Sequence, residues 1–482
     1  MITIGQNREC FFDDYLIDLE KTTAEFKLHS PIRKECVMLH DEPWEGDGCN
    51  FHNAFYDNGI WRMYYLGWWT GGNHPGGLRA CYAESKDGIH WVKPVLGLFE
   101  FNGSKENNVI MDRTENGGIG CFFVFKDENP ACPPEKRYKA IICHEEPAGV
   151  QNRRRSLWVY FSPDGIHFEK NGTLISTNGA FDTLNIAFWD TTIQKYRCYY
   201  RSAHHVGETA PIMWFENEDI RDIRYIESAD FENWTEQQLV DLGEEEVALY
   251  TNMIQQYYRA PQMLIGFPMR YIYRREWTKN YDELCGKEMR LERCAREDRL
   301  GKVVTDGLFM CSRNGVNFKL YREAFMRPGP EAPLNWVYGD ACFARMTIET
   351  PSEMEGADPE MSFYAPDNHW AQIPAKLIRS TLRCDGFVSL NAKDKEKTIV
   401  TKPFIFNGNE MRINFSTSAV GYLYITLTAD DGREIASCET FGDSIDRKVG
   451  FEGDLSEFSD KPVVMTVKIK DADLYAIRFL NA

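Results

Sequence analysis

The chain has 482 residues, of which 43% are hydrophobic and 27% charged, and its formal net charge is -18. This length exceeds the size at which a single hydrophobic core stops growing, so we expect two domains or one repeat-built domain with an appendage. The acidic excess repels phosphate backbones and anionic lipids, which excludes electrostatically driven binding to nucleic acid or membranes. Neutral ligands fit such a surface better. The 13% aromatic content suits the stacking of sugar rings, although large β-proteins also carry many aromatic residues.

The first residues, MITIGQNRECFFDD, contain no basic segment followed by an apolar stretch, and no apolar run approaches membrane-spanning length. The 14 cysteines form no CxxC pair and follow no regular spacing. Such a pattern predicts buried thiols in a reducing compartment rather than a disulfide framework or a zinc site. We therefore expect a cytoplasmic protein without a membrane partner, a cofactor or a metal motif.

A short turn sequence recurs along the chain, with first residues 66 to 84 positions apart. The copies are Ser85–Trp91, Ser162–Phe168, Ser228–Trp234, Ser312–Phe318 and, more weakly, Arg383–Phe387. Asp-Gly or Asn-Gly between strand-like flanks is a strong hairpin signal, and turn chemistry explains the acidic residue without a catalytic or metal role. A further strand pair precedes every copy. Four strands per unit and five units predict a five-bladed β-propeller.

Two regions depart from this repeat. Residues Tyr281 to Arg296 predict a helix inserted in blade four, because Glu283 and Lys287, and Glu292 and Arg296, are spaced as helical ion pairs. From about Lys393 onward the repeat stops, and short alternating segments predict a β-sandwich. The expected fold class is therefore all-β, with a five-bladed β-propeller catalytic domain at 1–390 and a β-sandwich domain at 391–482.

Blade geometry predicts which segments converge. The first strand of a four-stranded blade starts at one face of the disc, and the loop between the second and third strands returns to that face. Six of the ten histidines fall in those segments, together with tryptophans and cations, as a sugar pocket requires. The substrate-binding candidates are His52, Asn53, Trp68, Trp69, His74, His144, Glu145, Arg201, His204, Asn252, Arg270, Asp340 and His369. Any single histidine at a strand end also fits a hydrogen-bonded structural role.

Several segments carry a resemblance to a known group of enzymes. They are FFDDYLID (Phe11 to Asp18), DEPWE (Asp41 to Glu45), Glu84 to Ile110, LYTN (Leu249 to Asn252), Thr305 to Phe318 and Thr381 to Leu390. With them the chain resembles the five-bladed propeller glycosidases, the superfamily of invertases, levansucrases, arabinanases and mannoside phosphorylases. More closely, it is similar to a bacterial group labelled glycosyl-hydrolase family 32-like. The resemblance runs from Phe11 through the C-terminal region and implies a glycosidase.

The resemblance also implies three carboxylates at the starts of inner strands: a nucleophile or base, a stabilising acid and a general acid. Matching by blade position assigns Asp47, Asp182 and Glu246 to these roles in that order. The family's Asn-Asp-Pro-Asn, Arg-Asp-Pro and Glu-Cys motifs are absent, blade two offers only Glu115, and Glu246 belongs to an acidic run that also fits a solvated loop. The substitutes are Glu145, Glu146, Asp306 and Asp340.

Three functions stay open at this point. The leading one is the hydrolysis of a glycosidic bond in a small oligosaccharide by an exo-acting enzyme. The second is phosphorolysis, for which Arg201, His204, His205 and Arg270 supply a cationic cradle. The third is a catalytically inert sugar-binding propeller. A divalent ion in the axial channel, the stereochemical outcome and homo-oligomerisation also stay open.

Overall fold

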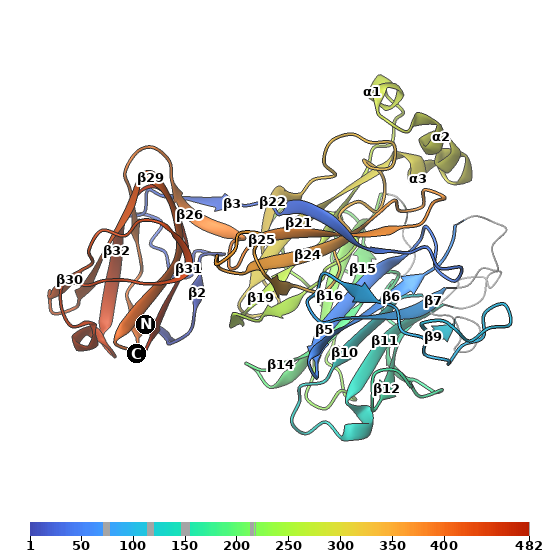
Figure 1. Ribbon diagram of the computed structural model, residues 1–482, viewed down its shortest axis with the longest axis horizontal. Helices are drawn as coiled ribbons and strands as arrows, with labels where there is room; N and C mark the ends of the chain where they lie inside the picture. Colours follow the sequence, from blue (N-terminus) through green and yellow to red (C-terminus); the bar gives the residue numbers. More distant parts are fainter. Residues whose placement is uncertain (71–77, 113–119, 146–154, 213–215, 217, 482) are drawn as a thin grey trace.

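The computed structural model describes residues 1–70, 78–112, 120–145, 155–212, 216 and 218–481, with only the backbone of Glu145. Two units are visible in Figure 1: a larger one built from separate sheets, and a smaller one that holds both chain termini. In the described part of the chain, no helix is long and apolar enough to cross a membrane.

Five separate antiparallel sheets form the larger unit, and each is one blade of a propeller. Blade one contains β5 (Asn50–Asp57), β6 (Ile60–Gly67), β7 (Arg79–Ser85), β8 (Trp91–Val92) and β9 (Val109–Asp112). Blade two contains β10 (Phe122–Lys126), β11 (Tyr138–Glu145), β12 (Arg155–Ser162) and β13 (Thr173–Ser176). Blade three contains β14 (Ile186–Asp190), β15 (Lys195–His204), β16 (Ile220–Ser228) and β17 (Gln238–Leu239).

Blade four contains β18 (Gln255–Tyr257), β19 (Ala260–Gly266), β20 (Met269–Tyr273), β21 (Val303–Ser312) and β22 (Lys319–Met326). Strands β19 and β20 pair with successive parts of β21, so together they form the second strand of this blade. The strand is interrupted at Phe267 and Pro268. Blade five contains β23 (Ile348–Thr350), β24 (Glu360–Asp367), β25 (Lys376–Arg383) and β4 (Ile32–Leu39). Its outermost strand, β4, comes from the N-terminal part of the chain and pairs antiparallel with β25, which closes the ring.

The recurring turn sequence works as a turn in the first four copies. In the first copy, Asp87 Oδ1 accepts the backbone N–H groups of Ile89 and His90, and Ser85 Oγ accepts that of Gly88. The copies at Asp164, Asp230 and Asn314 repeat these bonds. The acidic residue therefore caps its own turn, as the turn chemistry predicts.

Three of these turns also join neighbouring blades. The hydroxyls of Tyr64, Tyr199 and Tyr364 donate to the backbone carbonyls of Gly165, Gly315 and Gly88 at 3.0, 2.8 and 2.7 Å. Gly315 has a φ of +82°, and an added Cβ would lie 1.9 Å from the Arg197 guanidinium. Glycine is needed there for both the left-handed backbone and the close approach of the next blade.

The helical insertion lies between β20 and β21 of blade four, as expected, but it is broken into α1 (Lys279–Glu283), α2 (Lys287–Arg296) and α3 (Asp298–Lys302). Gly286 has a φ of 78° and sits against the carbonyl of Pro333, so a continuous helix cannot run through it. Lys287 consequently pairs with Asp282, at 2.8 Å, instead of Glu283. The two remaining short helices are η1 (Pro134–Lys136) and η2 (Leu455–Phe458).

The smaller unit is one hydrogen-bonded network of ten strands. Its strands are β1 (Ile2–Gly5), β2 (Glu9–Cys10), β3 (Glu25–Leu28), β26 (Val388–Ala392), β27 (Lys397–Val400), β28 (Phe404–Phe406), β29 (Glu410–Ala429), β30 (Glu434–Ala436), β31 (Asp443–Lys448) and β32 (Pro462–Leu480). Beyond residue 410, the short alternating segments expected from the sequence are joined into two long strands, β29 and β32, whose pairing shifts register between Thr417 and Tyr422. They enclose a separate apolar core that includes Phe11, Phe406 and Phe479.

These features confirm the all-β fold class and the five-bladed propeller, and the C-terminal strands are consistent with a sandwich. Strands β1, β2 and β3 from the N-terminal segment also belong to the smaller unit. The division of the chain at residues 390 and 391 stays a prediction.

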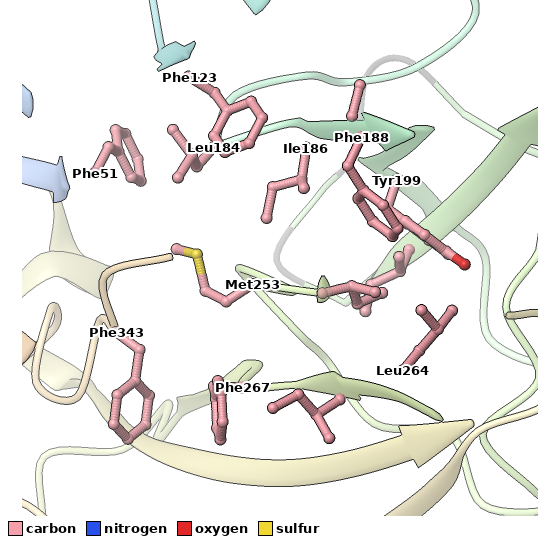
Figure 2. Close-up of a cluster of buried hydrophobic side chains, with 14 of the residues drawn as sticks. Phe51, Phe123, Leu184, Ile186, Phe188, Tyr199, Met253, Leu264, Phe267 and Phe343 are labelled. Atoms are coloured by element: carbon pink, nitrogen blue, oxygen red, sulfur yellow. The ribbon is translucent and has the colours of Figure 1, made fainter. Parts of the chain in front are cut away.

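One hydrophobic cluster of buried side chains extends through all five blades, and part of it is drawn in Figure 2. Each blade contributes one buried side chain from its first strand or from the segment that leads into it: Phe51, Phe123, Leu184, Met253 and Phe343.

Candidate active site

A cavity of about 500 Å³ opens on the face where the first strands begin. Every blade contributes the residues that precede or start its first strand, including Asn50, Gly120, Asp182, Tyr250 and Tyr338. The other lining residues come from strand ends, loops and the helical insertion: Phe51, Leu66, Trp68, Leu78, Arg155, Arg201, Glu216, Arg221, Glu297, Arg299, His369 and Trp370. The convergence expected from blade geometry is therefore present.

Aromatic side chains form one wall of this cavity. Trp68 and Trp370 meet edge to face with ring centroids 5.6 Å apart, and Tyr338 lies 5.1 Å from Trp370. Gly48 makes room for Trp68, because a Cβ there would lie 2.3 Å from the indole. Trp370 Nε1 and Asn50 Oδ1 are buried without a hydrogen-bond partner in the described part of the chain. Apolar ring faces beside free donors and acceptors suit a sugar.

Three carboxylates line the same cavity. Asp182 is 47% exposed and receives a hydrogen bond from Arg201 Nη2 at 3.2 Å, with Arg155 Nη1 at 3.8 Å. Glu297 is 51% exposed and accepts both Nε and Nη2 of Arg299, the latter at 3.1 Å. Glu216 is exposed, and no side-chain hydrogen bond or ion pair joins its carboxyl to the described residues. Of these three carboxylates, only Glu216 has no guanidinium partner among the described residues.

The cavity also gathers four arginines, Arg155, Arg201, Arg221 and Arg299. The Arg201 guanidinium lies 4.8 Å from the ring centroid of Tyr250, and that of Arg221 lies 3.9 Å from the ring centroid of Tyr271. Burial lowers the pKa of Arg221, and the positive charges of Arg201 and Arg299 lower it further. Such crowding of cations favours an anion or a developing negative charge in the cavity.

Two of the three predicted catalytic carboxylates lie away from this cavity lining. Asp47 is fully buried, and its carboxylate accepts the backbone N–H groups of Thr70 and Gln372 at 2.8 and 3.0 Å and the Thr70 hydroxyl. Glu246 is 35% exposed and accepts the N–H of Gly207, with His204 Nε2 at 3.5 Å. Asp182 alone of the trio lines the cavity. The catalytic roles of Asp47 and Glu246 stay predictions.

Three further predicted residues line the cavity, namely Trp68, Arg201 and His369. His369 stacks on Trp370 with centroids 4.8 Å apart. Burial lowers the pKa of His369 to about 3, and the charge of Arg293 adds to this effect, so the ring is neutral at physiological pH. It can therefore present a ring face and a neutral polar edge, but no positive charge.

His52 belongs to a buried network behind the cavity. Its Nε2 lies 3.1 Å from His40 Nε2, and His40 Nδ1 lies 3.4 Å from Glu45 Oε1. Lys93 Nζ donates to Glu45 Oε2 at 2.6 Å. Burial raises the pKa of Glu45, but His40 and Lys93 outweigh this effect and lower the pKa to about 2. This charged group is therefore held by its neighbours and is not exposed to a substrate.

The remaining described candidates are held by protein contacts outside the cavity lining. Asn53 exchanges side-chain hydrogen bonds with the backbone of Val124 and ties blade one to blade two. Asn252 accepts the N–H of Ile254. The other described candidates, with their partners, are His144 with Tyr160, His204 with Asp222, Arg270 with Asp306 and Asp340 with the N–H of Val337.

Trp69 is half-buried and is likewise not part of the lining. His74 and the side chain of Glu145, as well as Glu115 and Glu146, lie outside the described residues. In the part of the chain that is described, no three His, Cys, Asp or Glu side chains are grouped as metal ligands.

Some lining residues were recoverable from the sequence and others were not. Tyr250 and Tyr338 lie in segments that the blade geometry selects, and an aromatic residue there was a usable signal. Glu297 and Arg299 lie on the helical insertion, whose packing over the propeller has no counterpart in the repeat.

No protein-family model matches the chain, and no curated protein matches it. Among solved structures, the chain is similar to a sucrose-6-phosphate hydrolase from Lactobacillus gasseri at 10% identity, over 92% of this chain and 93% of that one, with a TM-score of 0.42. It is also similar to a family GH32 β-fructofuranosidase from Bombyx mori at 9% identity, over 95% of each chain, with a TM-score of 0.40. A structure titled for the GH130 family of mannoside phosphorylases matches at 13% identity, over 74% of this chain and 96% of that one, with a TM-score of 0.40.

Proposed function

We propose that the protein is a glycoside hydrolase that cleaves a glycosidic bond of a small oligosaccharide or glycoside in the axial cavity. The observation that carries this proposal is the meeting of open carboxylates with an aromatic wall. Asp182 and Glu216 open into the same cavity of about 500 Å³ as Trp68, Trp370 and Tyr338. Its size suits a small ligand, and glycoside hydrolysis requires two carboxyl groups in opposite protonation states beside a bound sugar ring.

The surroundings of the two carboxyls favour different roles. The carboxylate of Asp182 lies 3.2 Å from Arg201 Nη2 and 3.8 Å from Arg155 Nη1. It fits the group that faces the positive charge of an oxocarbenium-like transition state, as stabiliser, nucleophile or base. Glu216, without a guanidinium partner among the described residues, fits the proton donor to the leaving oxygen. An exo mode of attack is proposed with it, because a cavity of about 500 Å³ suits a small ligand.

The proposal is tested with chromogenic pyranosides and furanosides and the variants Asp182→Asn and Glu216→Gln. We expect kcat to fall by about 10²–10⁴-fold in each, because a general acid contributes that much to the rate. Asp47→Asn and Glu246→Gln are measured beside them to test the carboxylates predicted from the sequence. A glycoside with a good leaving group needs no proton from Glu216 when the bond breaks. Such a substrate should therefore restore much of the activity of Glu216→Gln, but it should not restore that of Asp182→Asn.

The outcomes separate the assignments. Full activity in Asp182→Asn and Glu216→Gln would overturn these roles, and loss only in Asp47→Asn and Glu246→Gln would return the roles to those two residues. Sugar binding by calorimetry without turnover of any glycoside would favour an inert carbohydrate-binding propeller.

Phosphorolysis is a second candidate, favoured by the four arginines that line the cavity. An inorganic phosphate needs a cationic cradle, and Arg201, Arg221 and Arg299 provide one beside Asp182. If phosphorolysis is the reaction, turnover depends on phosphate and yields a sugar 1-phosphate; turnover in phosphate-free buffer with release of the free sugar supports hydrolysis.

We also propose that the protein acts in the cytoplasm. All 14 cysteines are free thiols, and ten of them are buried. Free thiols persist in a reducing compartment, which supports this location. Its partner there is a small carbohydrate.

A further inference from the structure

A second cavity, of about 650 Å³, opens on the opposite face of the propeller. The same five blades build it, but from the other ends of their first strands. Blade one contributes Asn50 to the first cavity and Tyr56 to the second, and blade three contributes Asp182 to the first and Trp189 to the second. The two cavities have no lining residue in common. The second cavity is therefore a separate site and not an extension of the proposed active site.

The floor of this cavity holds an arginine whose charge is not neutralised. Arg345 lies in the segment that leads into β23, and its backbone is fixed to β5 by hydrogen bonds to His52 and Ala54. No carboxylate of the described chain lies within 4.0 Å of its guanidinium, and its buried Nε has no hydrogen-bond partner among the described residues. Burial lowers the pKa of Arg345 to about 10, which Glu128 only partly opposes.

A second unpartnered donor lies beside it. Gln255 is 6% exposed, lines the same cavity, and its Nε2 has no partner among the described residues. Of the other charged groups that line the cavity, Lys126 pairs with Asp57 at 2.5 Å and Glu349 pairs with Arg259 at 3.0 Å, whereas Glu128 is exposed and forms no ion pair with the described residues. Two buried donors, one of them on a guanidinium that forms no ion pair with the described residues, favour a ligand that brings acceptor oxygens and a single negative charge.

The walls of the cavity are aromatic. Tyr56 and Trp61 are adjacent, with ring centroids 5.3 Å apart, and Phe188, Trp189 and Tyr258 complete the wall. Tyr56 is 57% exposed, so an apolar surface remains open at the mouth. Aromatic faces of this kind stack on flat rings. A guanidinium fork matches a carboxylate in geometry, whereas a phosphate dianion would need further cations.

We propose that this second cavity is a binding site for a small organic carboxylate that carries a flat ring. The carboxylate pairs with Arg345 and the ring lies between the aromatic side chains at the mouth. This site is distinct from the proposed glycosidase site and does not depend on that activity.

The test is calorimetric titration of the full chain with benzoate, compared with its neutral analogue benzyl alcohol and with inorganic phosphate. We expect saturable benzoate binding with a Kd of about 1 mM, as its few non-hydrogen atoms allow. Benzyl alcohol and phosphate should bind at least tenfold more weakly. No saturable benzoate binding, or equal binding of benzyl alcohol or phosphate, would overturn the proposal.

Variants locate the binding. Arg345→Met should abolish it and leave the melting temperature equal or higher, because an apolar side chain replaces a buried uncompensated charge. Tyr56→Ala, at an exposed position, should weaken it without disturbing the fold, and this variant carries the test if Arg345→Met does not fold. The matched control Arg201→Gln removes an arginine from the first cavity and should leave benzoate binding unchanged. Binding that survives both Arg345→Met and Tyr56→Ala, or that is lost in Arg201→Gln, would place the ligand elsewhere.

Discussion

At the scale of one residue, burial changes the pKa of the Asp340 carboxyl group. It lies in the turn before β23, and its Oδ2 accepts the N–H of Val337 at 2.9 Å. Burial raises the pKa of Asp340 to about 7, Asp367 raises it further, and the distant charge of Arg293 opposes the rise. The folded protein therefore holds a proton at pH values where the unfolded chain, with an ordinary aspartate pKa near 3.9, has lost it.

This difference makes stability depend on pH. Between about pH 4 and 7 the folded state binds more protons than the unfolded state, so the free energy of unfolding falls as the pH rises. Asp340→Asn keeps an acceptor for Val337 but cannot ionise. Between pH 4 and 7.5, the free energy of unfolding should decrease in the wild type. We expect this decrease to be smaller in Asp340→Asn by roughly 1–3 kcal/mol.

Urea unfolding at the two pH values measures this effect. Glu355→Gln, in an exposed loop, serves as the control and should track the wild type. Equal pH dependence in Asp340→Asn and the wild type would show that the Asp340 carboxyl titrates as an ordinary aspartate.

At the scale of elements, helix α2 supports the wall of the proposed active site. Arg293 is buried, and its Nη2 donates to the carbonyls of His369 and Trp370 at 2.6 and 2.9 Å. Arg290 Nη1 and Nη2 donate in the same way to the carbonyls of Trp336 and Asn335. The insertion thus positions the blade-five loops that carry Trp370 and Tyr338, although Arg293 itself does not line the cavity.

Arg293→Lys should loosen this support, because an ammonium group cannot reproduce the planar fork. We expect KM for a cleaved glycoside to rise roughly tenfold, the effect of one hydrogen bond to a charged group, with a smaller change in kcat. Arg296→Lys, at an exposed position of the same helix, is the control and should leave KM unchanged. An unchanged KM in both variants would show that α2 does not contribute to substrate binding.

Some elements could be predicted from the sequence and others could not. The turn sequence identified the blades because the first four copies satisfy their hydrogen bonds within a few residues, as at Asp87 and Asp164. The break of the insertion at Gly286 and the fusion of predicted strands into β29 depend on tertiary contacts with Pro333 and β32, which leave no local pattern. Among the site residues, Asp182 and Trp68 followed from blade geometry, whereas Glu297 depended on the insertion.

At the scale of the whole molecule, the fifth turn copy has a different task from the other four. Asp385 is fully buried, and its carboxylate accepts hydrogen bonds from Tyr257 and Arg259 of the propeller and from Arg8 and Asn414 of the smaller unit. Phe12 packs against Tyr257 at the same junction, with centroids 5.6 Å apart. One carboxylate thus connects the two units.

Asp385→Asn should destabilise the protein by about 3–5 kcal/mol, because it leaves the buried charges of Arg8 and Arg259 less compensated. The control is Asp87→Asn in an exposed turn, where the fourth copy already has Asn314, and it should change stability by less than about 0.5 kcal/mol. Calorimetric unfolding measures both. Two resolved transitions in Asp385→Asn would show that this junction couples the units; a single transition at the wild-type temperature would show that it does not.

The closure of blade five by β4 has a consequence for the newly made chain. Strand β4 ends at Leu39, whereas its partner β25 begins at Lys376, so at synthesis rates of about 5–20 residues per second β4 leaves the ribosome roughly 20–70 s before β25. Throughout that interval it is an open strand edge on which another nascent chain can pair. Arg33, Lys34 and Glu35 place three charges along that edge, where they later pair with Asp367, Glu353 and Arg379. The charges of Arg33, Lys34 and Glu35 form ion pairs in the folded propeller. During translation, the same charges therefore disfavour aggregation through the unpaired edge of β4.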